Sequence, residues 1–177
     1  MPRFGDGLWP GSYKIGAWYD TSTADDVVDD VNGDPMALTG LPPRRRDGRY
    51  GAYINFEQQL TGNLSAFLNA VVADKRTATT DRQIAAGLIY TGPFSARPED
   101  DIGLAAGTTH VNSRVADVED LQNLPEQTYE YAFELYYTLR PVDSLLIRPN
   151  LQYVYHPGGT SQNDDVIVFG LKASANF

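Results

Sequence analysis

Two glutamates, Glu130 and Glu134, are spaced along the chain in a way that invites comparison with the acid and nucleophile of a glycoside hydrolase. They lie in a segment that alternates between apolar and polar residues, a pattern typical of a β-strand, so both face the same side. Four residues of strand span about 13 Å, whereas the carboxyl groups of a glycosidase pair lie about 5–9.5 Å apart. The spacing argues against hydrolysis, and we expect no catalysed reaction.

A calcium-loop pattern begins at Asp30 and continues through Asn32 and Asp34, which match the first three ligand positions of an EF-hand loop. The sixth position requires glycine and is Pro35, and the twelfth requires an acidic ligand and is Leu41. We therefore expect a solvated acidic loop, with a loose divalent-ion contact as the alternative.

Other metal and cofactor chemistry has little support. The sequence contains no cysteine, which removes disulfides and thiolate ligands. His110 and His156 fall in separate predicted strands without a third ligand in view. No Ser-His-Asp arrangement and no phosphate-binding glycine loop is present. We predict no metal site and no cofactor.

Three consecutive arginines, Arg44, Arg45 and Arg46, lie in the predicted connection 23–48, which also contains the calcium-loop pattern. A solvated loop is one interpretation of this cluster. The others are contact with the phosphates of lipopolysaccharide and folding of the arginines into a channel lumen.

The elements that must position these residues are eight runs with a period of two, typical of β-strands. Most are long enough for the roughly 9–11 residues with which a tilted strand crosses a bilayer. Their approximate ranges are 11–22, 49–60, 64–74, 81–91, 100–111, 128–140, 144–156 and 165–177.

The connections between the runs include long acidic segments at 23–48 and 112–127 and short ones at 61–63 and 141–143. Long loops outside the cell and mostly short turns inside are typical of outer-membrane barrels. The amino-terminal residues Met1–Asp6 show no charged-then-apolar signal segment, so either a signal has been removed or the chain is part of a longer one.

Each run has one apolar and one polar face. In 128–140 the apolar face contains Tyr129, Tyr131, Phe133, Leu135, Tyr137 and Leu139, and in the final run it contains Ile167, Phe169, Leu171, Ala173, Ala175 and Phe177. Tyrosine and phenylalanine gather toward the ends of these faces, as interfacial aromatics do in membrane proteins. The charged opposite faces favour a transmembrane barrel over a soluble lipocalin-like barrel, in which the apolar side would point inward.

Composition agrees with one domain over residues 1–177. The net charge is −9, which argues against nucleic acid as a partner. The mean hydropathy is −0.36 and nothing approaches the roughly 18 consecutive apolar residues of a membrane helix, but barrel strands expose apolar side chains only at alternate positions.

Several segments resemble the carbohydrate-selective porin family, the OprB-like porins. The matching residues include Tyr13–Ser22, Gly51–Tyr53 leading to Gln58–Leu60, and Gly92–Phe94 through Arg97–Asp101. The most specific block is Pro149–Gly159, followed by the closing strand to Phe177. The resemblance runs nearly end to end, in the order of the family.

The resemblance implies an integral protein of the bacterial outer membrane that lets small sugars, monosaccharides such as glucose, diffuse passively. Family members resemble barrels of about sixteen strands, and this chain aligns with the carboxy-terminal half. We therefore expect an all-β, antiparallel transmembrane barrel that is either half of a larger pore or assembled with further copies or another chain. The alternative is a small closed eight-stranded barrel with a filled interior that serves as an anchor or interaction module.

Sugar selectivity in a pore arises from the donors, acceptors and charges that line it. By strand parity, the predicted lumen-facing residues are Trp18, Asp20, Asn55, Glu57, Gln83, Glu130, Glu134, Arg140, Arg148, Asn150, Gln152 and Lys172. Glu130, Glu134, Arg148 and Asn150 rank first because they lie near the middle of their strands. The simpler interpretation is that many of these groups only keep the lumen hydrated or pair with neighbours. The expected partners are small carbohydrates, outer-membrane lipid and lipopolysaccharide.

Overall fold

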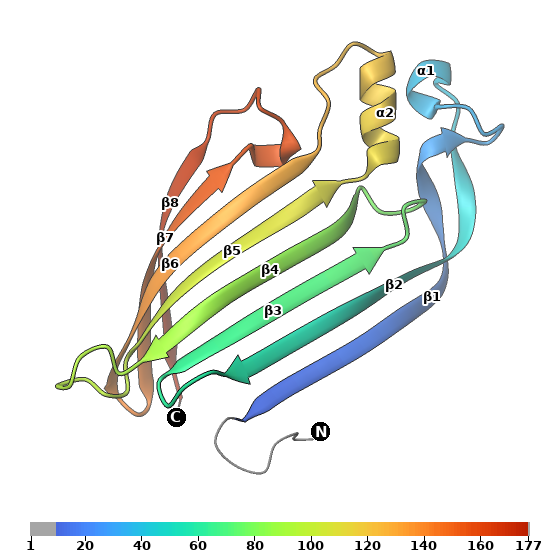
Figure 1. The fold of residues 1–177 in the computed structure, drawn as a ribbon. Coiled ribbons are helices and arrows are strands. Elements are labelled where there is room, and N and C mark those ends of the chain that lie inside the picture. The colour runs from blue at the N-terminus through green and yellow to red at the C-terminus, as the bar shows by residue number, and fades with distance from the viewer. Residues whose placement is uncertain (1–9, 177) are drawn as a thin grey trace.

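A computed structural model describes residues 10–176 of the chain. The amino-terminal residues considered above for a signal segment, and Phe177, lie outside this range. Within it the chain forms eight strands, two short α-helices and one 3₁₀ turn, in a single sheet (Figure 1). The elements are β1 (Gly11–Asp30), α1 (Met36–Thr39), β2 (Pro43–Gln59), β3 (Leu64–Ala73), β4 (Thr80–Thr91), β5 (Asp101–Val111), α2 (Ser113–Leu121), β6 (Tyr129–Val142), β7 (Leu145–Tyr155), η1 (Pro157–Gly159) and β8 (Val166–Ala175).

Each strand pairs antiparallel with the next, in the order β1 to β8, which confirms the predicted all-β architecture. The long connections lie at one end of the sheet, here called the loop end, and the short turns 60–63 and 143–144 lie at the other, here called the turn end. The β4–β5 connection, residues 92–100, is also at the turn end. Because the number of strands is even, β1 begins and β8 ends at the turn end.

The first predicted loop was too long. β1 extends to Asp30 and β2 begins at Pro43, so much of the segment 23–48 is paired strand. The extension is held by cross-strand partners of opposite charge, since Asp25 faces Arg45 in the register and their side chains are 2.7 Å apart. Period-two hydrophobicity did not reveal this extension because its residues are charged rather than apolar.

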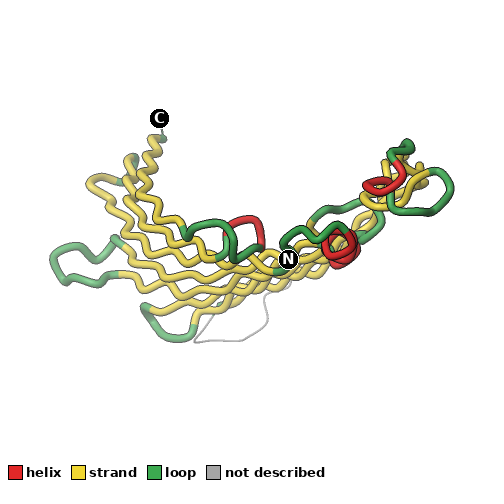
Figure 2. The backbone as a smooth tube through the Cα atoms, turned by 90° about the horizontal axis from the view of Figure 1, so that it is seen from above, coloured by secondary structure: helices red, strands yellow, loops and turns green. Residues whose placement is uncertain are grey.

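The sheet is open. β1 and β8 are the first and last strands in the pairing order, and the described residues contain no pairing between them. Figure 2 shows the strands as an arc rather than a ring. The small closed barrel that we considered as an alternative is therefore wrong for this chain, because its two edges do not meet.

The burial pattern is the reverse of that in a soluble domain. Side chains on one face of the sheet are strongly exposed although apolar, as for Ile15 at 79% and Phe169 at 82%. The most completely buried side chains are polar, and they include Asp26, Asn112 and Thr138. An apolar face of this size requires a cover other than water. No helix in the described part of the chain is both long and apolar enough to cross a membrane.

Aromatic side chains lie toward both ends of the apolar face. At the loop end, Tyr131 and Tyr155 are cross-strand partners with ring centroids 6.2 Å apart. At the turn end, Tyr13 and Phe56 are partners in an edge-to-face arrangement with centroids 5.5 Å apart. Two aromatic rows separated by an aliphatic band are typical of a face that crosses two membrane interfaces.

Candidate functional site

The candidate site is the polar face of the sheet. Cross-strand partners share a face, and following the register from strand to strand places the predicted lumen residues on one side. The chain of partners runs, for example, from Lys14 to Asn55 to Asn69 and from Glu134 to Gln152. Parity along each strand puts Trp18, Asp20, Glu57, Gln83, Glu130, Arg140, Arg148, Asn150 and Lys172 on this same side.

This polar face is the concave one. The carboxylate of Glu130, on the polar face of β6, accepts a hydrogen bond of 2.8 Å from the backbone N–H of Gly158 in η1. The view from above shows the helical segments on the inner side of the arc (Figure 2). The polar side chains therefore converge, and the apolar side chains diverge.

One group of polar residues lies on β6 and β7. Asn150 donates from Nδ2 to Oε1 of Glu134 over 2.5 Å, and Gln152 is the cross-strand partner of Glu134. Asn150 fits closely because Gly170 is its partner on β8, where a Cβ would lie 2.0 Å from Oδ1 of Asn150. These three side chains offer carboxylate and amide groups, which both accept and donate hydrogen bonds.

An ionic group continues toward the turn end. Arg140 forms an ion pair of 2.7 Å with the buried carboxylate of Asp101. Arg148 donates from Nε to the hydroxyl of Thr138 over 2.7 Å, and its guanidinium lies over the ring of Tyr136 at 4.3 Å from the centroid. Lys172 is the cross-strand partner of Arg148, so positive charge is concentrated here.

A second polar group lies on β1 to β4 around a hollow of about 410 Å³. Its polar lining comes from Lys14, Tyr53, Asn55, Asn69 and Gln83. The amides of Asn55 and Asn69 are joined by a hydrogen bond of 2.5 Å. Nearer the loop end, Asp20 pairs with Arg49 at 2.6 Å. Glu57 lies on the other side of this group, opposite Ser12 and Phe67 in the register.

Three aromatic rings lie against the polar face above glycines. A Cβ at Gly51 would be 2.0 Å from the Trp18 ring, and one at Gly16 would be 2.6 Å from the Tyr53 ring. Gly103 has the same relation to Tyr136, at 2.2 Å. Because glycine has no side chain, each ring can lie close to the backbone and present its other surface to the concave side.

Between the two polar groups, the concave face consists of small residues. The central strands contribute Ala85, Gly87, Ala105, Gly107 and Ala132 at the matching positions of the register. Side chains of this size leave the space above the sheet open. The polar groups therefore border a free region instead of filling it.

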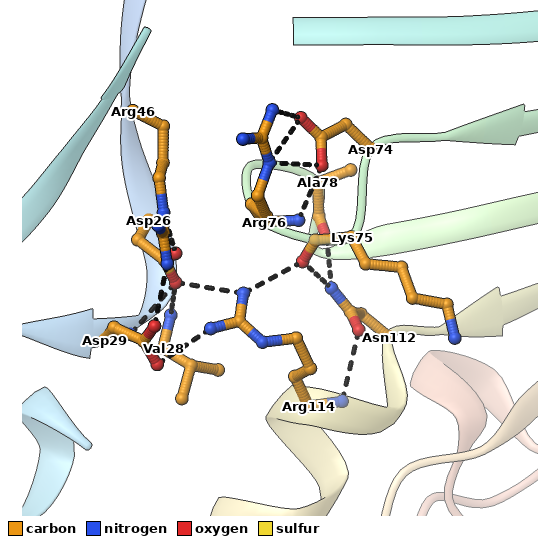
Figure 3. A network of polar contacts seen from close by, with 10 residues as sticks. All are labelled: Asp26, Val28, Asp29, Arg46, Asp74, Lys75, Arg76, Ala78, Asn112 and Arg114. Atoms are coloured by element: carbon orange, nitrogen blue, oxygen red, sulfur yellow. Dashed lines mark hydrogen bonds and ion pairs between the residues drawn. The ribbon is translucent and has the colours of Figure 1, made fainter. Parts of the chain in front are cut away.

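The loop end of the site is held by an ion network (Figure 3). Arg46 on β2 contacts Asp26 at 2.7 Å and Asp29 at 2.8 Å, and Arg114 on α2 contacts the same two carboxylates at 3.0 and 2.7 Å. Arg114 thus fastens α2 to the extension of β1. Gln122, at the carboxy-terminal cap of α2, also donates to the backbone C=O of Ala37 in α1 over 3.2 Å.

The arginine cluster was placed wrongly by the sequence analysis. Arg44–Arg46 lie in β2, not in a loop, and Arg45 and Arg46 are engaged in ion pairs.

Asp30 organises the connection between β1 and β2. Its Oδ1 accepts hydrogen bonds from the backbone N–H groups of Asn32, Gly33 and Asp34, and its Oδ2 accepts one from the hydroxyl of Thr39. This is the geometry of an Asx-type turn, in which an aspartate side chain accepts hydrogen bonds from the backbone of its own loop. Within residues 10–176, no three His, Asp or Glu side chains are grouped to hold a metal ion.

Five further residues that line this face were not among the predicted lumen residues, namely Lys14, Tyr53, Asn69, Asp101 and Tyr136. The alternation of side chains along a strand identified the other lumen residues. It also identifies these five when it is applied to every strand and to aromatic as well as charged residues. Asp101 lies at the first position of β5 and within the predicted run 100–111, where its parity already places it on the polar face.

A curved antiparallel sheet with a polar, open concave face and an exposed apolar convex face is typical of β-barrel proteins of the porin class. The carbohydrate-selective porin family, OprB, matches residues 1–177. The chain belongs to this family. The family is one of porins rather than enzymes, in agreement with the expectation that no reaction is catalysed.

The chain is similar to Porin B of Pseudomonas aeruginosa, with 39% identity over the whole chain and 43% of that relative's length. It is 33% identical to the putative porin QuiX of Acinetobacter baylyi, over 95% of this chain and 40% of the relative. Among solved structures, the high-pH structure of Pseudomonas putida OprB superposes with a TM-score of 0.89 at 40% identity, over 96% of this chain and 45% of that one. The chain thus spans less than half the length of these relatives, and the sheet corresponds to part of a larger barrel.

Proposed function

We propose that this chain forms part of the wall of an outer-membrane pore through which small sugars such as glucose diffuse passively. The observation that carries the proposal is the concave face, which combines hydrogen-bonding side chains and flat-lying aromatic rings around an open floor of alanine and glycine. The convex apolar face, with its two aromatic rows, meets membrane lipid. The long connections at the loop end lie outside the cell, as is usual for these barrels.

A sugar has hydroxyl groups around its rim and less polar C–H surfaces on its two faces. The amide and carboxylate groups of Asn150, Gln152 and Glu134 match the hydroxyls, and Trp18, Tyr53 and Tyr136 offer platforms for the ring. Lining groups of these types determine what passes through a pore. The arginines and acids of both signs also keep the face hydrated, which lowers the barrier for a polar solute.

The two edge strands need partners in the membrane. Unpaired N–H and C=O groups cost several kcal/mol each in hydrocarbon, so spanning sheets are closed. The partner is a further set of strands, which is supplied either by more chain of the kind present in the longer relatives or by other copies. We favour the first, because the relatives align with this chain over less than half their length.

Conductance across a planar bilayer tests the proposal. The protein is inserted with the strands that complete its barrel, and glucose is added at increasing concentration. Steady channels whose current falls saturably with glucose support a sugar pathway. A barrel that is folded and inserted but carries no current, or whose current is insensitive to glucose, would count against it.

A further inference from the structure

Three cations border the apolar face at the loop end. Lys75 and Arg76 lie in the β3–β4 turn, and Arg82 lies near the start of β4. The register places Arg82 on the apolar face, opposite Val72 and His110. A charged group at the border of an apolar face requires a specific reason.

Two of these cations lie over tyrosines of the aromatic row. The Arg76 guanidinium carbon is 5.6 Å from the ring centroid of Tyr50, and that of Arg82 is 5.7 Å from the centroid of Tyr129. Both distances are in the range of a cation–π contact. The charged heads are therefore positioned at the level of the tyrosine row, where a membrane headgroup layer begins.

Buried carboxylates pair with these cations and orient them. Asp74 pairs with Arg76 at 2.7 Å, and Asp81 pairs with Lys75 at 3.3 Å and with Nδ1 of His110 at 2.6 Å. A register shift between Thr80 and Arg82 brings Asp81 to this side, as a β-bulge does. The two carboxylates are 2% exposed, whereas the cationic side chains keep 54%, 39% and 45% of their surface exposed for Lys75, Arg76 and Arg82. The cationic heads are therefore exposed at the surface, while the acids that pair with them are buried.

The turn that carries Lys75 and Arg76 is rigidly fixed. Asn112 is fully buried and donates from Nδ2 to the backbone C=O groups of Lys75 and Ala78, over 2.5 and 2.8 Å (Figure 3). Arg114 adds a third bond to the C=O of Lys75. A ligand that binds these cations does not need to order the turn first.

A shallow apolar hollow of about 230 Å³ adjoins the cations on the same face. Its lining includes Ile15, Ala52, Ile54, Ala70 and Val72. Val72 is the cross-strand partner of Arg82, so the hollow ends directly beside the charged group. An apolar trough that ends at a positive cluster matches a molecule with an acyl chain below an anionic headgroup.

We propose that Lys75, Arg76 and Arg82 bind a phosphate of an acylated phosphoglycolipid in the outer leaflet, the lipid A portion of lipopolysaccharide, with an acyl chain in the adjoining hollow. The proposal rests on the outer-membrane placement given under the proposed function. It is independent of the sugar path, because these residues are on the opposite face.

The test is binding of purified bisphosphorylated lipid A to the protein in neutral detergent, measured by native mass spectrometry. Lys75→Gln/Arg82→Gln removes two charge-assisted contacts and is expected to weaken binding about tenfold or more. The matched control is Arg97→Gln at the turn end, where Arg97 also pairs with a buried acid, Asp100, beside an aromatic row. The control is expected to bind as the unmodified protein does, and dephosphorylated lipid A is expected to bind as weakly as the double variant.

A second variant, Ala70→Leu, fills the hollow without changing charge and is expected to weaken binding of the acylated lipid. Equal binding by the double variant and the control would overturn the proposal. So would displacement of the lipid by an equal concentration of inorganic phosphate, because the site would then be a simple anion site. Glucose-dependent conductance is expected to be unchanged in all three variants, and its absence in the unmodified protein would refute the pore and not the lipid site.

Discussion

Arg148 and Tyr136 are stacked on the concave face, with the guanidinium carbon 4.3 Å from the ring centroid. The Tyr136 ring lies close to the sheet because Gly103 beneath it has no side chain. The hydroxyl of Thr138 accepts a hydrogen bond from Arg148 and orients it. A planar guanidinium fits this stacking and a lysine ammonium does not. The pair places a positive charge and an aromatic surface side by side in the proposed pore.

We predict that Arg148→Gln shifts the ion selectivity of the pore toward cations, because it removes a lining charge while leaving a polar side chain. The reversal potential under a salt gradient measures this shift. Arg45→Gln is the control, since Arg45 lies in an exposed ion pair on the β1–β2 extension. Equal shifts in the two variants would show that Arg148 does not face the permeant ions.

We predict that Glu134→Ala weakens the saturable block of current by glucose about two- to twelvefold, the effect of losing one hydrogen bond of about 0.5–1.5 kcal/mol. Glu134→Gln retains an acceptor and is expected to lose less. Leu135→Ala, one residue along on the apolar face, serves as the control for the strand itself. Unchanged block in Glu134→Ala would remove this residue from the sugar path.

Asn112 caps α2 and holds the β3–β4 turn, and it is fully buried. Asn112→Ala leaves the C=O groups of Lys75 and Ala78 without this donor, at a cost of about 1–3 kcal/mol. We predict that the loop end opens locally, so limited proteolysis within residues 112–128 speeds up about tenfold or more while the strands stay protected. Gln122→Ala removes an exposed contact of α2 and should leave the cleavage rate nearly unchanged.

The stability of the fold is expected to depend on pH through two aspartates in the turns. The hydrogen bond from Arg76 holds the pKa of Asp74 below its ordinary value, and Arg97 does the same for the pKa of Asp100. Because the folded-state pKa values are depressed, these groups stabilise the fold above the ordinary Asp pKa of about 3.9, and the contribution is lost as pH falls through the folded values.

We therefore predict that urea midpoints measured in lipid vesicles change little from these groups between pH 8 and pH 5, and fall below about pH 4. The Asp74→Asn/Asp100→Asn variant is expected to be less stable at neutral pH and to show a shallower acid decline. An unaltered acid decline in this variant would assign the effect to other carboxylates.

The central part of every strand and the identity of its two faces were predictable, because a period of two is set by the alternation of side chains across a sheet. The extension of β1 and β2 was not, since it depends on charged pairs such as Asp25–Arg45 that have no hydrophobic period. Helix α2 was missed because it is short and its position depends on Arg114 contacting residues far away in the sequence. Whether the sheet closes depends on the pairing of β1 and β8, which no local pattern encodes.

The accessibility of adjacent positions on β5 to a water-soluble reagent tests directly which face of the sheet borders the pore. The chain has no cysteine, so single substitutions can be labelled without background. Ala105 belongs to the concave face and Ala106 to the convex face, where its partners are Ala86 and Phe133. In membranes, a charged, water-soluble thiol reagent is predicted to modify Ala105→Cys at least about tenfold faster than Ala106→Cys, since thiolate chemistry requires water. Modification of Ala105→Cys should also reduce glucose flux. Equal rates, or faster labelling at Ala106→Cys, would contradict the assignment of the polar face to the pore.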